Sequence, residues 1–87
     1  MKAVVTVIGK DMVGILAKVS TACADNNANV IEVTQSVLDE YFAMIMVIDI
    51  SEMKCEIIDL KKDIEKRVPD MQIHVMHEDI FNSMHRI

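Results

Sequence analysis

Apolar and polar residues alternate along the chain with spacings that predict strands and helices in turn. Residues 2–8 are rich in β-branched side chains and predict a strand. From Met12 onward, apolar residues recur at steps of three and four, which predicts an amphipathic helix. This helix is expected to end within residues 25–29, because asparagine tolerates the left-handed conformation of a helix C-terminus. Residues 30–37 then alternate as a half-exposed strand, with one face formed by Ile31, Val33 and Val37 and the other by Glu32, Thr34 and Ser36.

The second half of the chain predicts two further strands and two helices. In order, its pattern indicates a hairpin turn at 38–40, a nearly continuous apolar strand at 41–50, a helix at 52–67, a strand at 71–77 and a short terminal helix at 78–87. Ser51 is expected to cap the first of these helices, and Pro69 is expected to end it.

The resulting order, β-α-β-β-α-β with a terminal helix, is typical of a ferredoxin-like α+β sandwich. In that fold two helices cover one face of a four-stranded antiparallel sheet, and right-handed crossovers put the first and third strands in the centre. The segments 4–8 and 42–48 are apolar on both faces, as central strands are. We therefore expect a single domain over residues 1–87.

Two helices cover only one face of such a sheet, so the other apolar face needs a cover. The terminal helix is one candidate and a second subunit is the other. The exposed edge of the second strand also invites pairing with another chain. We expect a homodimer or a higher even oligomer in which Phe81 and Met84 are buried.

Composition narrows the class of partner. The 87 residues include 52% apolar residues and carry a formal net charge of −5. Binding to nucleic acid or to an anionic membrane needs basic patches, so neither is expected. No apolar run approaches the ~20 residues of a membrane span, no signal peptide is recognisable, and Cys23 and Cys55 are too few for a disulfide scaffold. A cytoplasmic protein with reduced thiols is the simplest interpretation.

The residues that carry catalysis or bind metals do not form a recognisable set. His74 and His77 fall on opposite faces of the last predicted strand, because their separation is odd. His74 shares its face with Met76, but two soft donors make an incomplete metal site. Cys23 falls on the apolar stripe of the first helix, and no nucleophile elbow, Walker loop or zinc motif is present. We expect no metal, no cofactor and no enzymatic activity.

The stretch from Gly9 to Ile15 is the strongest candidate for binding, because it joins the first strand to the first helix. Free N–H groups at a helix N-terminus, here those of Met12 to Ile15, attract a carboxylate or a phosphate. Asp11 can pair with an ammonium group, and Asn29 adds an amide at the start of the second strand. A positive helix end beside an acidic side chain complements a zwitterion such as a free amino acid.

The same stretch also has a purely structural interpretation. Gly9 makes the turn, Asp11 caps the helix, and Gly14 relieves packing inside its first turn. A glycine there costs about 1 kcal/mol of helix propensity relative to alanine. Its missing side chain is therefore expected to serve close approach by a ligand or by another backbone.

Several stretches of the chain, taken together, resemble the ACT domain. The resemblance is carried by the strand at 4–8, the loop at 9–15, the opening of the second strand at Asn29-Val30-Ile31, the hairpin stretch at 36–44 and the tail at 80–87. It covers essentially the whole chain, and the hairpin and tail narrow it to the short stand-alone ACT proteins of bacteria and archaea.

The resemblance implies a regulatory module that commonly binds an amino acid or a similar small ligand. In ACT domains the first loop and helix of one subunit face the second strand of its neighbour, and the ligand sits between them. By position, the implied site residues are Asp11, Met12, Val13, Gly14, Ile15, Asn29, Val30 and Ile31. ACT domains usually regulate an attached enzyme, so a regulated protein partner is expected outside this chain. The alternative is a dimerisation or partner-binding module without a ligand.

Overall fold

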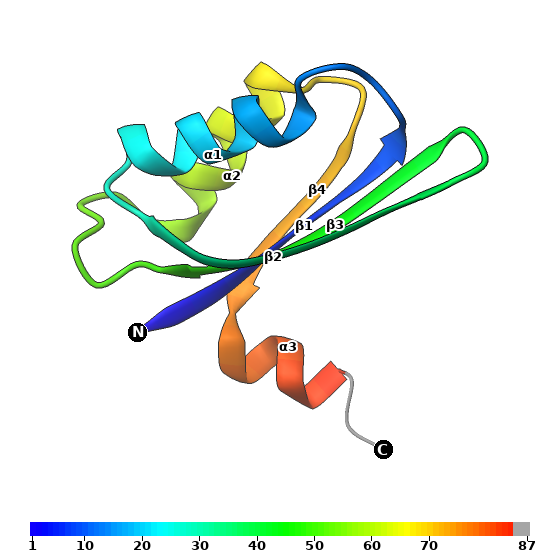
Figure 1. Cartoon of the computed structure of the whole chain (residues 1–87). Coiled ribbons are helices and arrows are strands. Elements are labelled where there is room, and N and C mark those ends of the chain that lie inside the picture. The colour runs from blue at the N-terminus through cyan, green and yellow to red at the C-terminus, as the bar shows by residue number, and fades with distance from the viewer. Residues whose placement is uncertain (85–87) are drawn as a thin grey trace.

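The computed structural model describes residues 1–84 and has the expected ferredoxin-like α+β architecture (Figure 1). Its elements are β1 (Lys2–Lys10), α1 (Ile15–Asp25), β2 (Asn29–Leu38), β3 (Tyr41–Asp49), α2 (Ile57–Arg67), β4 (Gln72–His77) and α3 (Glu78–Met84). Helices α1 and α2 lie on one face of the sheet, and α3 lies on the other (Figure 1). Residues 85–87 of the expected terminal helix lie outside the described residues.

The four strands form one antiparallel sheet in the order β2-β3-β1-β4. The expected central positions of the first and third strands are therefore confirmed. In the register of the two central strands, Val5 lies opposite Met46 and Val7 lies opposite Met44. These positions face α1 and α2, where the core of the protein lies.

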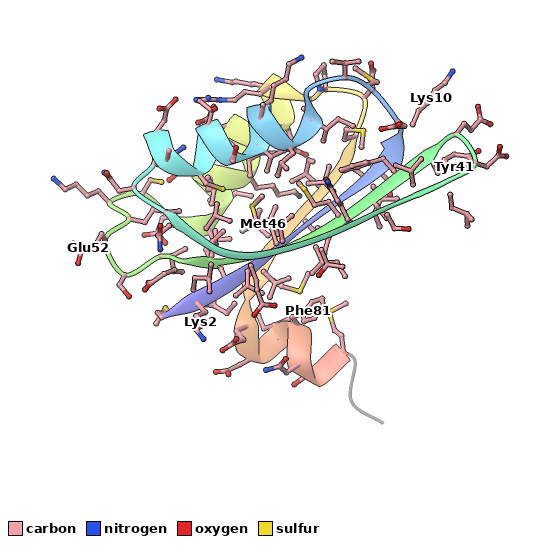
Figure 2. The ribbon with its side chains drawn as sticks, in the orientation of Figure 1. Lys2, Lys10, Tyr41, Met46, Glu52 and Phe81 are labelled. Carbon is pink, nitrogen blue, oxygen red and sulfur yellow. The ribbon has the colours of Figure 1, made fainter. Side chains whose placement is uncertain are left out.

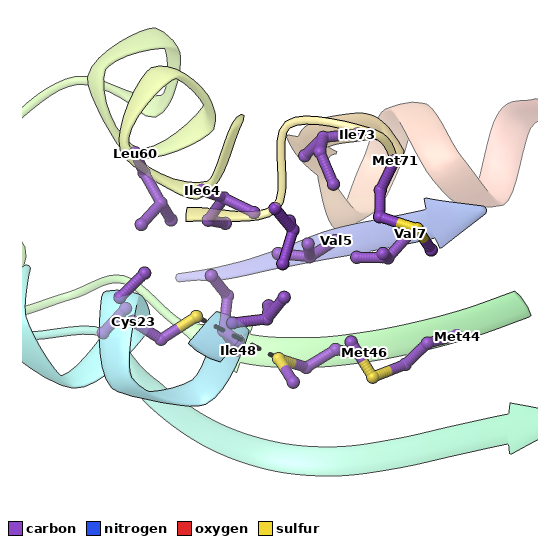
Figure 3. Close-up of a cluster of buried hydrophobic side chains, with 14 of the residues drawn as sticks. Val5, Val7, Cys23, Met44, Met46, Ile48, Leu60, Ile64, Met71 and Ile73 are labelled. Atoms are coloured by element: carbon purple, nitrogen blue, oxygen red, sulfur yellow. Dashed lines mark hydrogen bonds between the residues drawn. The ribbon is translucent and has the colours of Figure 1, made fainter. Parts of the chain in front are cut away.

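The core is built from alternating strand residues and from one stripe on each of α1 and α2 (Figure 3). Met44, Met46 and Ile48 of β3 are fully buried, as are Leu60 and Ile64 of α2. Methionine fills irregular gaps well because its side chain is unbranched and polarisable. This property compensates for the scarcity of aromatic residues, of which Phe42 belongs to the core.

Cys23 of α1 belongs to this core, as its place on the apolar stripe predicts. Its Sγ lies 4.0 Å from Sδ of Met46, and the side chain is completely buried. Burial raises the pKa of the Cys23 thiol to about 11, because the thiolate would lose its hydration. The residue is therefore a core side chain with little thiolate character.

The sheet face opposite α1 and α2 is only partly covered. Helix α3 contacts β1 and β4, and Val4 is buried on this face. Ile8 and Ile45 are exposed on the same face, by 49% and 42%. Met84 is 64% exposed and Phe81 is half-buried, so their burial stays a prediction for the assembly.

The second helix begins later than the sequence predicts. Glu56, and not Ser51, precedes α2, and its side chain and that of Asp59 form a reciprocal capping box. The backbone N–H of Ser51 instead donates to Oδ1 of Asp49 at 2.9 Å. Cys55, which the sequence places inside this helix, lies before it, and its thiol donates to Oδ1 of Asn26 at 3.5 Å.

The two turn predictions are confirmed. Asp39 has a φ of 58° and begins the two-residue turn between β2 and β3. Asn27 has a φ of 60° directly after α1, where the sequence places a left-handed asparagine.

Arg67 ties the ends of the two core helices together. Its guanidinium bonds to Oδ1 of Asp63 at 3.0 Å and to Oδ2 of Asp25 at 2.9 Å. Asn26 also donates to Asp63, at 2.8 Å. The hydrogen bond from Arg67, with help from Asn26, lowers the pKa of the Asp63 carboxyl below its ordinary value.

Among residues 1–84, no helix is both long enough and apolar enough to cross a membrane.

Candidate functional site

The candidate loop begins with a glycine whose role differs from the prediction. Gly9 does not make a turn but lies within β1, opposite Phe42. A Cβ atom added here would lie 2.8 Å from Sδ of Met71 and 3.2 Å from the carbonyl oxygen of Asp70. The close approach of the segment that joins α2 to β4 therefore favours a glycine at this position.

Gly14 directly precedes α1. It is the N-cap residue, with a φ of 88° in the left-handed region, and not a residue of the first turn. Glycine adopts this conformation without the strain that a Cβ atom brings. An added Cβ would meet only Cε of Lys18, at 3.9 Å, so crowding is not the reason for this glycine. The expected cost in helix propensity does not apply.

Asp11 does not cap α1, because no side chain does so. The backbone N–H of Asp11 instead donates to the carbonyl oxygen of Glu40, at 2.8 Å. This bond ties the candidate loop to the hairpin turn between β2 and β3, a contact that no pattern in the sequence predicts. The side chain of Asp11 is exposed and takes no part in capping.

The N-terminus of α1 lies three residues later than expected. The first intrahelical bond runs from the N–H of Lys18 to the carbonyl oxygen of Gly14, at 3.0 Å. The free N–H groups at this end belong to residues 15–17, so Ile15 is the one member of the expected set, residues 12–15, that lies there. Val13 is 97% exposed beside them, whereas Ile15 is buried and anchors the helix to the core.

The other part of the predicted site lies at the beginning of β2. Asn29 lies opposite Asp49, and Val30 is half-buried against the core. The register shifts between Val30 and Glu32, so Ile31 sits in an irregularity of the ladder and is exposed. Asn29 and Ile31 are thus accessible along an edge of the sheet.

A single chain does not bring the two parts of the site together. The candidate loop follows Lys10, which lies opposite Tyr41, whereas Asn29 lies opposite Asp49 at the other end of β3. Strand geometry puts these ends about 25 Å apart. Figure 2 shows the same separation, with Lys10 and Tyr41 at one end of the sheet and Lys2 at the other.

The edge of the sheet at β2 is long and open. All ten residues of this strand except Val30 are exposed. Val33, Val37 and Leu38 add apolar side chains to it, and Leu38 is 78% exposed. Exposed edges of this length pair readily with another strand.

His74 and His77, the histidines within residues 1–84, do not lie together. The register puts His74 opposite Thr6 and His77 opposite Ala3, so the two imidazoles lie on opposite faces of β4, as predicted. Within residues 1–84, no three His, Cys, Asp or Glu side chains gather closely enough to hold a metal ion.

Comparison with known proteins identifies the family. A family model for the ACT domain matches residues 2–78. A UPF0237 protein of Methanocaldococcus jannaschii is 48% identical, and the match covers 99% of this chain and 98% of that protein. The solved structure of an ACT domain protein from Streptococcus pneumoniae has 37% identity and a TM-score of 0.77, over 98% of each chain.

A more distant structure shares the fold alone. The ligand-free regulatory subunit of aspartate kinase from Thermus thermophilus has 21% identity and a TM-score of 0.62, over 85% of this chain and 49% of that one. The match to the family model defines the class as ACT domains, a family of regulatory modules that bind small ligands. The chain belongs to the ACT domain family, and the resemblance seen in its sequence is confirmed.

Proposed function

We propose that this chain is a regulatory module that senses an amino acid between two copies of itself. The observation that carries this proposal is the separation of the candidate loop from the start of β2. When two copies pair through antiparallel β2 strands, the two strands run in opposite directions. The start of one β2 therefore lies beside the end of the other, near the loop that the backbone of Asp11 ties to the hairpin turn.

Such an arrangement supplies groups for both charges of an amino acid. The N-terminus of α1 has no side-chain cap, so its N–H groups are available to a carboxylate. Asp11 is exposed and can receive an ammonium group, and the partner's edge adds the amide of Asn29. Met12 and Val13 are also exposed beside the loop and can cover the aliphatic part of a ligand. The proposed role is regulatory and not catalytic, and the proposed location is the cytoplasm.

Thermal unfolding in the presence of each of the twenty amino acids tests this function. A ligand that binds only the folded state raises the midpoint of unfolding. Calorimetry then compares the wild type with Asp11→Asn, which removes the charge and keeps the size of the side chain. Because Asp11 caps nothing, this variant is expected to fold normally and to lose about tenfold or more in affinity. Glu65→Gln, an exposed charge removal on α2, is the matched control and is expected to bind normally.

The second candidate is a ligand-free dimerisation or partner-binding module. It is favoured by the apolar side chains that cluster around the hairpin end of the sheet, where Val13, Leu38 and Tyr41 are all exposed. No thermal shift with any amino acid, together with a stable dimer, would support this function over amino-acid sensing.

A further inference from the structure

A hollow lies on the sheet face opposite α1 and α2, beneath α3. Its volume is about 330 Å³, which falls within the lower range of small-molecule pockets. Ile8 and Ile45 of the central strands form its apolar floor, and Phe81 and Met84 of α3 form its wall. Figure 2 shows Phe81 on α3 below the sheet, away from the proposed loop site near Lys10.

Two polar side chains face each other across the strands in this hollow. Thr6 of β1 and His74 of β4 both line it, and they are direct partners in the antiparallel register. Their Cβ atoms therefore lie about 5 Å apart on the same face. Within residues 1–84, neither side chain has a hydrogen-bond partner. A hydroxyl and an imidazole N–H both donate, so the pair presents two donors at one point of an apolar surface.

The side chains that line the hollow indicate which kind of ligand fits it. Among the described residues that line it there is no Asp or Glu to receive an ammonium group. An amino acid would leave its positive charge unpaired there, which is costly on an apolar surface. A monocarboxylate with an apolar body meets two donors at its head and aliphatic or aromatic side chains along its length.

We propose that the hollow beneath α3 binds small apolar monocarboxylates, with the carboxylate held by Thr6 and His74. This site is independent of the proposed amino-acid site. The two sites differ in their response to an ammonium group, which the amino-acid site binds and the hollow leaves unpaired. Binding there would fix α3 against the sheet, since Phe81 and Met84 would contact the ligand from one side and Ile8 and Ile45 from the other.

The experiment uses pairs of probes that differ only in the ammonium group. 4-Methylpentanoate is paired with leucine, and 3-phenylpropanoate is paired with phenylalanine. Each is titrated into the labelled full chain while the backbone amide signals are followed by NMR. The two carboxylates are expected to shift the amide signals of residues around the hollow, in β1, β3, β4 and α3. The amino acids are expected to leave those signals unchanged.

Variants test the polar pair directly. Thr6→Val keeps the shape and removes the hydroxyl, and His74→Leu removes the imidazole; each is expected to weaken carboxylate binding about tenfold. His74→Gln restores a donor and is expected to recover part of the affinity. His77→Leu, on the opposite face of the same strand, is the matched control and is expected to bind like the wild type.

Several results would overturn the proposal. One is the absence of any shift with either carboxylate at about 10 mM, the weak end of specific binding. Another is equal binding of the acids and the amino acids at the hollow. A third is evidence that a second copy of the chain fills the hollow. In that case Ile45→Lys would abolish self-association, and the carboxylates would not shift the amide signals of the wild type. Failure of the amino-acid proposal is a separate result, because it concerns the signals of residues 11–17 and 29–31.

Discussion

The backbone N–H of Asp11 donates to the carbonyl oxygen of Glu40 at 2.8 Å, which joins the loop before α1 to the turn between β2 and β3. The bond connects segments almost thirty residues apart in sequence. It places the candidate loop at the end of β2 and far from its beginning. For this reason the proposed amino-acid site needs a second copy of the chain to be complete.

The conformation of Gly14 gives the first prediction. Gly14→Ala is expected to lower the free energy of unfolding by about 1 kcal/mol, because a Cβ atom is strained at a φ of 88°. Gly14→Asn is expected to cost less, since asparagine tolerates the left-handed region better than alanine does. Urea unfolding of the two variants checks the order. Equal losses for alanine and asparagine would show that the backbone conformation is not the cause.

Arg67 gives a prediction about pH. Its hydrogen bond lowers the pKa of Asp63 in the folded state, so the unfolded chain binds a proton there more readily. The resulting stabilisation is present above the ordinary carboxyl pKa of 3.8 and is lost as the pH falls through the lower folded value. Arg67→Gln is therefore expected to lose stability at neutral pH and to show a flatter decline under acid conditions. Urea unfolding between neutral pH and the acid transition measures both effects.

The matched control for that experiment is Lys62→Gln, which removes an exposed cation of the same helix that does not act on the carboxyl of Asp63. Its pH profile is expected to follow the wild type closely. Asp49, whose pKa is lowered by its bonds from Ser51, contributes the same slope to every variant. A profile of Arg67→Gln parallel to that of the wild type would remove Asp63 as the source of the slope.

The two thiols are expected to differ in reactivity. Cys23 is completely buried and its pKa is raised to about 11, so both access and thiolate fraction are low. Cys55 is half-buried before α2. Under native conditions a thiol reagent is expected to modify Cys55 first, and Cys55→Ser is expected to remove the fast phase. Rapid modification that persists in Cys55→Ser would contradict this order. Denaturant is expected to make both thiols reactive in the wild type.

The open edge at β2 predicts how the chain assembles. Thr34 lies near the middle of this strand, opposite Ile45 of β3. In two copies paired through antiparallel β2 strands, lysines at position 34 lie close to each other and repel. Thr34→Lys is expected to shift the mass measured by light scattering from dimer toward monomer at micromolar concentration. Thr21→Lys, the same change on the exposed surface of α1, is the control and is expected to leave the mass unchanged. A dimer that survives Thr34→Lys would exclude this edge as the interface.

The sequence by itself determined the type and order of the elements, because strand and helix periodicities are local properties. The β-branched run at the beginning predicts β1, and the steps of three and four predict α1. The two-sided apolar character of residues 42–48 predicts a central strand, and β3 does lie inside the sheet, although its outer face is only partly covered. The left-handed residues after α1 and in the hairpin turn follow from local turn chemistry.

Only the tertiary structure decided what the individual site residues do, because their partners are distant in sequence. Gly9 lies close to the backbone of Asp70 and the side chain of Met71, more than sixty residues away, and no local pattern contains these contacts. Local capping preferences favoured Asp11 as the N-cap residue of α1. In the structure the left-handed Gly14 takes the N-cap position, and the backbone of Asp11 bonds to Glu40 instead. The register of the sheet set Asn29 and the loop at opposite ends, and the packing of α3 against β1 and β4 created the hollow around Thr6 and His74. Periodicity assigns a residue to one face of its helix or strand. The distance between residues on different elements depends on how the whole chain packs.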